Sequence, residues 1–207
     1  MNRLLERVLE HPVLYRLSQA PFGDQKLPRI FAQTDPRTVR RVLDVGCGPG
    51  TNTAYFAHAD YLGVDINPRY IAEARRRYRR DFIAADATAF TVPQGARFDF
   101  ILVNSLLHHL DLLQTRRVLS RLAPLLSEEG CIHCIEVVMP ERWGPPRLMA
   151  RADRGRFCRP IEEWRSIFSE FFRTVVFEHF VEKLFGIDCL EFVYFKGAGR
   201  EGSCDCR

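Results

Sequence analysis

Short apolar runs alternate with amphipathic segments along most of this 207-residue chain. The apolar runs, rich in Val, Ile and Phe, predict buried strands at residues 42–45, 61–64, 81–85, 98–103 and 130–138. Between them, apolar residues spaced by three or four positions predict helices at residues 53–57, 68–78 and 111–126. Strands that alternate with helices favour a parallel sheet covered by helices on both faces.

The C-terminal part of the chain changes this pattern. A helical stretch at residues 161–168 precedes two alternating runs at residues 172–177 and 188–195, which predict an antiparallel hairpin. We therefore expect a single α/β domain over residues 1–196. It should hold a doubly wound, mostly parallel seven-stranded sheet with an antiparallel C-terminal hairpin. Residues 197–207 show no apolar period and are expected to form a flexible tail.

Two further segments stand outside the alternation. Residues 1–34 predict one or two short helices interrupted at Pro12, and Asp35-Pro36 then predicts a helix start ahead of the first strand. Residues 139–160 hold four prolines among aromatic and arginine side chains. Because proline resists regular structure, we expect a partly helical excursion from the sheet there.

The most informative stretch joins the first strand to the helix after it. It reads Asp44-Val-Gly46-Cys-Gly48-Pro-Gly50, and the glycines permit a tight turn that a ligand can approach closely. Thr51 and Asn52 are expected to cap the following helix, which would point its amide groups at that ligand. Asp65 ends the next strand, about 20 residues on, where a nucleotide-binding βαβ unit places an acid for the ribose hydroxyls.

The glycine spacing distinguishes two nucleotide cofactors. A dinucleotide site reads G-x-G-x-x-G or A, which would put Gly or Ala at position 51, but Thr51 stands there. The pattern Asp44-x-Gly46-x-Gly48-x-Gly50 resembles instead the first motif of the class I S-adenosylmethionine (SAM) dependent methyltransferases. The resemblance covers residues 40–140 with specific motifs, and it extends to residue 196 by the order of elements alone.

This resemblance implies SAM as the cofactor, S-adenosyl-L-homocysteine as its product, and a set of cofactor contacts. Asp44 would hold the turn and the methionine end of SAM, Asp65 the ribose, and Asp86 with Ala87 the adenine. The backbone at Asn104 would lie near the methionine end. The cofactor contacts expected in this way are Asp44, Gly46, Cys47, Gly48, Gly50, Asn52, Thr53, Asp65, Ile66, Asp86, Ala87, Asn104 and Ser105.

The resemblance also suggests where the methyl acceptor binds. Residues 1–34 would form a helical lid, and residues 139–160 a substrate-side insertion. The candidate substrate contacts are Tyr15, Phe22, His109, Glu136, Trp143, Arg151 and Arg156. Each has a plainer interpretation: the aromatic residues as packing, the arginines as solvated side chains, and Glu136 as a strand-end acid with an ordinary hydrogen-bond partner.

His108 and His109, which follow the fourth strand, are the candidate catalytic residues. Imidazole titrates near neutral pH, so either ring could act as a base toward a hydroxyl or amine acceptor. Alternatively, the two rings only shape the wall of the pocket. Methyl transfer mainly requires that nucleophile, methyl carbon and sulfur be aligned, so no catalytic triad needs to be found.

Composition limits the choice of partners. The net charge is +4, and the chain lacks the dense basic stripe of a nucleic-acid binder. No apolar run reaches the 18 residues that a membrane span requires. The first residues do not resemble a signal peptide, so a cytoplasmic location and free thiols are expected for the seven cysteines. Cys131 and Cys134 would point to opposite faces of a strand, and we predict no metal site.

We therefore predict methyl transfer from SAM to an O, N or C nucleophile of a small-molecule metabolite, by a monomer or homodimer. One alternative is a SAM-binding regulatory or assembly protein that transfers no methyl group. A second is an RNA or protein methyltransferase. Against the second, an Asn or Asp-Pro-Pro-Tyr or Phe motif is missing after the fourth strand, where the sequence reads Asn104-Ser-Leu-Leu.

Overall fold

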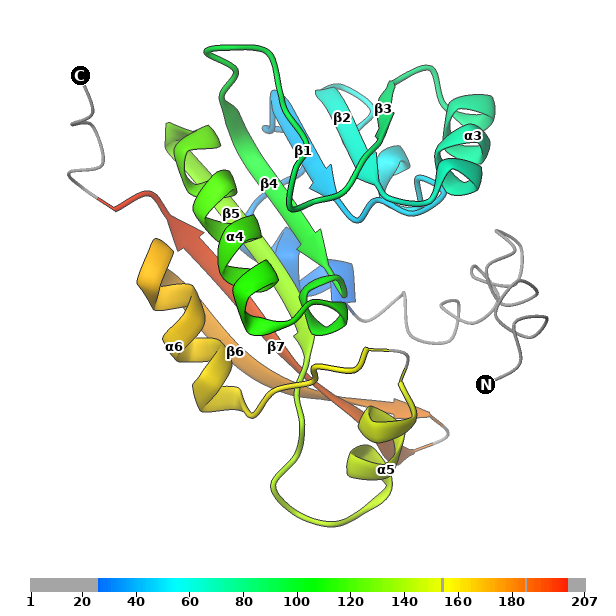
Figure 1. Ribbon diagram of the computed structural model, residues 1–207, viewed down its shortest axis with the longest axis vertical. Helices are drawn as coiled ribbons and strands as arrows, with labels where there is room; N and C mark the ends of the chain where they lie inside the picture. Colours follow the sequence, from blue (N-terminus) through cyan, green and yellow to red (C-terminus); the bar gives the residue numbers. More distant parts are fainter. Residues whose placement is uncertain (1–25, 154, 185, 201–207) are drawn as a thin grey trace.

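A seven-stranded sheet forms the centre of the computed structural model, which describes residues 26–153, 155–184 and 186–200 (Figure 1). The strand order is β3-β2-β1-β4-β5-β7-β6. The strands are β1 (Arg41–Val45), β2 (Asp60–Asp65), β3 (Asp81–Ala84), β4 (Phe98–Asn104), β5 (Leu126–Val137), β6 (Arg173–Leu184) and β7 (Ile187–Ala198). Strands β1 to β5 pair in parallel, whereas β7 is antiparallel to both β5 and β6. The predicted fold class, with its C-terminal hairpin, is confirmed.

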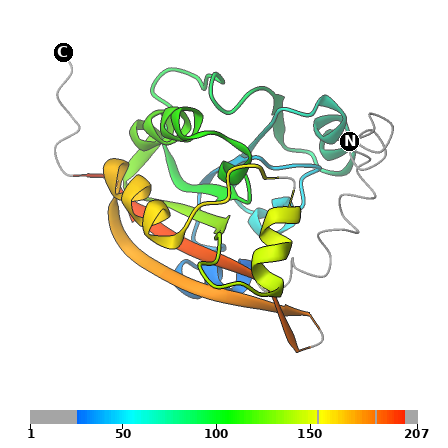
Figure 2. The ribbon, with the colours of Figure 1, turned by 60° about the horizontal axis from the view of Figure 1, so that its bottom comes forward.

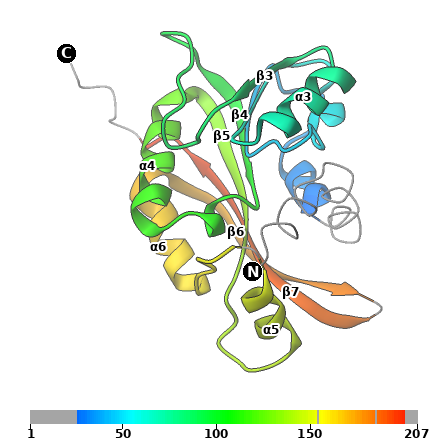
Figure 3. The ribbon, with the colours of Figure 1, turned by 45° about the vertical axis from the view of Figure 1, so that its right-hand side comes forward.

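Helices cover both faces of this sheet. They are α3 (Pro68–Arg77), α4 (Leu112–Leu122), α5 (Pro145–Ala152) and α6 (Ile161–Phe171), with a further helical segment at residues 26–33. Short 3-10 turns are η1 (Thr53–Phe56), η2 (Leu107–His109) and η3 (Ala123–Leu125). Figure 3 shows α4 and α6 on one face, and α3 with the segment 26–33 on the other.

Successive side chains of each central strand point to opposite faces of the sheet. In β4, Ile101 and Val103 pack beneath α4 and α6, whereas Phe100 and Leu102 pack beneath α3 and the segment 26–33. All four side chains are fully buried. A central parallel strand is covered on both faces, which explains why its sequence is a continuous apolar run.

The boundary between α4 and β5 differs from the prediction. Helix α4 ends at Leu122, a 3-10 turn containing Pro124 follows, and β5 begins at Leu126 instead of Gly130. The predicted helix was too long because proline interrupts the backbone hydrogen bonding. Gly130 lies inside the strand at an irregularity in the β4–β5 register, where a Cβ atom would lie 2.6 Å from the carbonyl oxygen of Phe98.

Two further predicted boundaries also change. Asp35-Pro36 forms a turn instead of a helix start, because the Asp35 carbonyl and carboxylate accept from the amides of Thr38 and Arg37. Strand β7 runs to Ala198, so the predicted tail begins in a strand that is paired with β5 and β6. Within the described part of the chain, no helix has the length and apolar character that crossing a membrane requires.

Candidate active site

The turn after β1 lies at the carboxyl edge of the sheet, where open α/β folds bind their ligands. Gly46, Gly48 and Gly50 all have positive φ angles, of 79°, 55° and 77°. This conformation strongly favours glycine. Gly48 and Gly50 are buried, and Gly46 is partly buried beside the Leu106 side chain. The amides of Gly46 and Cys47 donate to the carbonyl oxygen of Val64 at 2.8 and 3.1 Å, so the turn is fixed to the end of β2.

Asp44 lies directly beneath this turn and is completely buried. Its Oδ2 accepts hydrogen bonds from Tyr61 Oη at 2.6 Å and Asn52 Nδ2 at 3.1 Å, whereas Oδ1 has no partner among the described residues. Burial raises the pKa of Asp44 to about 6, although these two hydrogen bonds oppose the shift. A buried acceptor without a partner is costly unless a ligand supplies a donor.

The same contact corrects a prediction about Asn52. Its side chain makes no capping hydrogen bond, and the element after it is the short 3-10 turn η1 instead of a regular helix. The amide group of Asn52 instead fixes the orientation of the Asp44 carboxylate. Thr53, also expected near the cofactor, is buried beside the turn, and its Oγ1 has no partner among the described residues.

Asp65 connects the glycine turn to the start of α3. Its Oδ2 accepts from the amide of Gly48 at 2.9 Å and its Oδ1 from the amide of Asn67 at 2.8 Å. Partial burial raises the pKa of Asp65, and the hydrogen bonds from these two amides oppose that shift. Since each carboxylate oxygen has two acceptor sites, the side chain can still receive a pair of vicinal hydroxyl groups.

The residues expected around the adenine lie next to Asp65 along the sheet edge. The amide of Ala85 donates to the carbonyl oxygen of Asp65 at 3.0 Å, which brings the end of β3 to that of β2. Asp86 is exposed, and its Oδ1 accepts from the amide and hydroxyl of Thr88. The side chain of Ile66 is 70% exposed, an apolar surface available to a flat ring.

Beyond β4, Ser105 adopts a positive φ of 55°, which is uncommon for a residue other than glycine. Its amide donates to Ile135 O, and its hydroxyl contacts Asn104 Oδ1. The hydroxyl also accepts from Lys26 Nζ at 3.1 Å, and Lys26 is only 5% exposed. Burial lowers the pKa of Lys26, while the Glu182 carboxylate opposes that shift. A lysine side chain therefore lies where the resemblance places the methionine end of SAM.

Glu136, at the end of β5, anchors the turn η2 that carries both histidines. Its Oε1 accepts from the amides of Leu106 and Leu107, and its Oε2 from the amide and the Nδ1 of His108. The carboxylate is completely buried. The geometry thus gives Glu136 an ordinary structural role and offers no support for a substrate contact.

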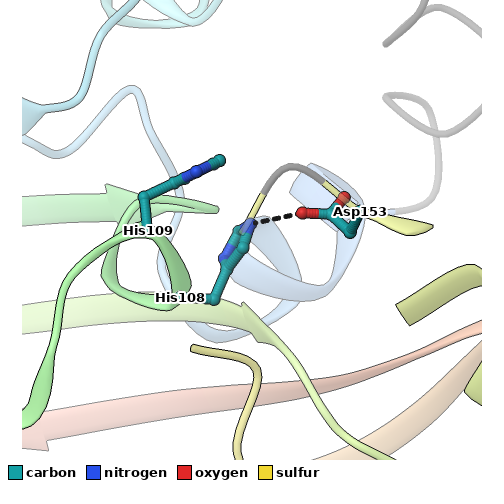
Figure 4. A group of neighbouring side chains, drawn as sticks. All are labelled: His108, His109 and Asp153. Atoms are coloured by element: carbon teal, nitrogen blue, oxygen red, sulfur yellow. Dashed lines mark ion pairs between the residues drawn. The ribbon is translucent and has the colours of Figure 1, made fainter. Parts of the chain in front are cut away.

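Figure 4 shows that Asp153 approaches the other side of the His108 ring, with Oδ1 3.3 Å from Nε2. Burial would lower the pKa of His108, but the carboxylates of Asp153 and Glu136 outweigh it and raise the pKa to about 9. His108 is therefore an imidazolium at neutral pH, with both nitrogens engaged. In this state it cannot accept a proton, whereas His109, on the same turn, is exposed.

The segment after α5 folds closely over this turn. The amide of Phe157 donates to His108 O at 2.9 Å, and the guanidinium of Arg159 donates to the carbonyl oxygens of Leu107 and Leu110. A Cβ atom on Gly155 would lie 1.9 Å from Cδ2 of His108, so only glycine fits there without rearrangement. The predicted substrate-side insertion thus contacts the predicted catalytic turn.

His108, His109 and Asp153 bring one possible metal-ligand atom each within 4.8 Å of one another. A metal would need a lone pair from His108, however, and a proton already lies on each of its nitrogens in the imidazolium form. We assign no metal to this cluster, and the predicted absence of a metal site stays a prediction.

The remaining substrate candidates are not gathered at this turn. Trp143 is exposed in the loop before α5, and Arg151 is exposed on α5, which lies beyond the carboxyl end of β5 (Figure 1). Arg156 is exposed as well. Tyr15 and Phe22, and most of the predicted lid, lie outside the described residues.

Sequence reasoning missed three residues of the site: Lys26, Tyr61 and Asp153. Each reaches its partner across the fold, from 79, 17 and 45 positions away in the chain respectively. Only Tyr61 carried a local signal, since an aromatic hydroxyl next to a buried strand acid is a suitable donor.

Comparison with known proteins agrees with this geometry. Residues 42–130 match the model of a family described as a methyltransferase domain. This segment, which holds the glycine turn, Asp44 and Asp65, is similar to the class I, Rossmann-like methyltransferases. A trans-aconitate 2-methyltransferase of Methylobacterium nodulans is 38% identical over 131 residues, which cover 59% of this chain and 47% of that protein.

Solved structures share the fold. The NodS N-methyltransferase of Bradyrhizobium japonicum WM9, in complex with S-adenosyl-L-homocysteine, has a TM-score of 0.61 at 20% identity, with 79% of each chain covered. The PH0226 protein of Pyrococcus horikoshii OT3 has a TM-score of 0.67 at 16% identity, covering 90% of this chain and 92% of that one. The chain spans about half the length of the curated relatives it matches.

Proposed function

We propose that this protein transfers a methyl group from SAM to an O, N or C nucleophile of a small-molecule metabolite. The main support is the pair Asp44 and Asp65, which flank a turn of three glycines with positive φ angles at the carboxyl edge of the sheet. The buried Oδ1 of Asp44 has no partner among the described residues, so the turn is built to receive a further donor. Methyltransferase relatives support the reaction class.

The residues present fit the chemical groups of SAM. Asp65 offers acceptor sites for the ribose diol, and Ile66 offers an exposed apolar side chain for the adenine. We propose that Lys26 holds the methionine carboxylate, because its ammonium donates a single hydrogen bond among the described residues and has three donors. Asp44 would also contact the methionine end of SAM.

The protein's contribution to the reaction would be positioning. The sulfonium of SAM, when bound, supplies an electrophilic methyl group. What remains is to align the acceptor and exclude water, and such alignment is worth roughly 7–11 kcal/mol in the best cases. Glu136 and Asp153 hold the His108 imidazolium, and this fixes the turn on which His109 lies. If the acceptor needs a base, we assign that role to His109.

The first acceptors to test are carboxylic acids such as trans-aconitate, since the relatives are named for that substrate. The full chain is incubated with SAM carrying a labelled methyl group, first with trans-aconitate and then with a metabolite extract. Label in a small-molecule product is the expected result. Tight SAM binding with label in no product would instead identify a SAM-binding protein that transfers no methyl group. Label in RNA or protein would show that the acceptor is a macromolecule and not a small molecule. A cytoplasmic location and a monomeric or homodimeric state stay predictions, to be checked by fractionation and light scattering.

A further inference from the structure

A hollow of about 460 Å³ lies between the loop before α5 and the end of the β6–β7 hairpin. Arg142, Trp143 and Pro145 line it on one side, and Lys183 and Ile187 on the other. Figure 2 shows that the hairpin end projects beyond the rest of the molecule, with α5 beside it. This end is distinct from the glycine turn, because β4 and β5 separate β1 from β7 in the sheet.

Large apolar side chains protrude around this hollow. Trp143 is 70% exposed and Ile187 is 60% exposed at the hollow, and Leu148 on α5 is 57% exposed. Together these side chains, on the loop before α5, on α5 and on β7, indicate an interaction site.

Guanidinium groups surround the protruding tryptophan. The Arg151 and Arg147 guanidinium carbons lie 4.8 and 5.4 Å from the centre of the Trp143 ring. Trp143 stays 70% exposed beside these two cations. An aromatic side chain with cations beside it is the combination found where proteins meet the headgroups of a bilayer.

The charges at this end are unbalanced in favour of the cations. Neither Arg142 nor Arg151 has a carboxylate partner among the described residues, and Arg147 donates to the carbonyl oxygens of Pro140 and Glu141. The nearby Asp188 is paired with Lys183, whereas Glu191 is paired with His179, which is charged only if protonated. Against the carboxylates of Glu141 and Glu191, the three arginines leave an excess of one positive charge.

We propose that Trp143, Leu148 and Ile187, with Arg142, Arg147 and Arg151, form a docking surface for an anionic phospholipid bilayer. The three apolar side chains would enter the headgroup region, and the arginines would contact lipid phosphates. Protruding apolar side chains that are few and surrounded by cations suit a bilayer better than a protein partner, whose interface would have a broader apolar centre. This surface does not depend on the identity of the methyl acceptor.

The two tryptophans of the chain provide the test. Trp164 is fully buried and stacks on Phe168, whereas Trp143 is exposed, so a change in emission on adding vesicles reports Trp143. The full chain is mixed with vesicles of phosphatidylcholine and phosphatidylglycerol in a 3:1 ratio, and with vesicles of phosphatidylcholine alone. We expect a blue shift and co-sedimentation with the anionic vesicles, both weakened by high salt.

A matched pair of variants tests the location of the surface. The double variant Arg142→Gln/Arg151→Gln should lower the partition coefficient about 30-fold, since one basic residue near an anionic surface contributes about fivefold. The control variant Arg69→Gln/Arg77→Gln removes the same amount of charge from α3. It should change the partition coefficient less than about threefold, because α3 lies on another part of the molecule. Trp143→Ala should abolish the emission change.

Three results would overturn the proposal: no co-sedimentation of the full chain with anionic vesicles, equal losses in both double variants, or an emission change that persists in Trp143→Ala. Binding to RNA or to an acidic protein without vesicle binding would also overturn it. Thermal unfolding of each variant confirms that the fold is retained, so a loss of partition reports the surface alone.

Discussion

Glu136 holds His108 twice, accepting a hydrogen bond from its backbone amide at 3.2 Å and from its Nδ1 at 2.6 Å. The same carboxylate also accepts from the amides of Leu106 and Leu107. One buried side chain therefore fixes both the backbone of η2 and the protonation state of the ring on it. The turn and its histidine depend on a residue from the adjacent strand.

Glu136→Ala should lower the free energy of unfolding by about 3–5 kcal/mol, because it leaves a buried imidazolium and three amides without an acceptor. Glu170 is the matched control, since it pairs with Arg116 at the surface. Glu170→Ala should cost below about 1 kcal/mol. Urea denaturation followed by circular dichroism measures both, and equal losses in the two variants would contradict the role given to Glu136.

The His108 imidazolium should make stability depend on pH. Its pKa is about 9 in the folded protein and about 6.5 when unfolded, so protonation stabilises the fold. This contribution is fully present below pH 6.5, is lost as pH rises toward 9, and amounts to about 3 kcal/mol. The difference in unfolding free energy between the native protein and His108→Asn should therefore shrink over that interval. A difference that grows with pH would show that the ring is neutral in the folded state.

Asp65→Ala should abolish detectable binding of SAM and of S-adenosyl-L-homocysteine, because the ribose diol loses its acceptors. Two hydrogen bonds to a charged group, at roughly 1.5–3 kcal/mol each, correspond to a loss of at least about 100-fold. Asp65→Asn retains one acceptor oxygen, so its affinity for SAM should lie between those of the native protein and Asp65→Ala. Calorimetric titration measures the affinity, and near-normal binding by a folded Asp65→Ala would refute the assignment of the ribose site.

Lys26→Met should weaken binding of S-adenosyl-L-homocysteine about 10- to 100-fold, the value of one charge-assisted hydrogen bond. Lys26→Arg retains the cation and should restore much of that affinity. The control ligand is methylthioadenosine, which lacks the methionine carboxylate and should bind native protein and Lys26→Met alike. If both ligands lose equal affinity, Lys26 only supports the packing around Ser105.

His109→Ala should lower turnover by less than the factor of 10² to 10⁴ that a general base contributes. Positioning supplies most of the acceleration in the proposed reaction, so a base is needed only for an acceptor that must lose a proton. The measurement is the turnover number at saturating SAM, with cofactor affinity determined in parallel. A larger loss at unchanged affinity would make His109 a catalytic base.

The sequence alone predicted those parts of the molecule that local patterns determine. The continuous apolar run of β4 and the glycines after β1 each require one backbone conformation, so strand, turn and sheet edge followed directly. Asp44 and Asp65 were found because they stand at fixed distances from those glycines.

Contacts between distant segments were not predictable in this way. Asn is a residue type that often caps helices, but the Asn52 side chain instead donates from Nδ2 to the buried Asp44 carboxylate and makes no capping hydrogen bond. Lys26 is an ordinary helix residue in the sequence, and only the fold brings it to Ser105. Asp153 likewise meets His108 through the path of a proline-rich segment whose course no periodicity determines.

The close approach of Gly155 to His108 also limits how this protein can change over time. A methyl group at position 155 would occupy the space of the imidazole and would also lie 2.9 Å from the backbone oxygen of His108. A smaller side chain at position 108 would relieve only the contact with the ring. Among descendants of this sequence, position 155 should therefore change only after position 108 has changed.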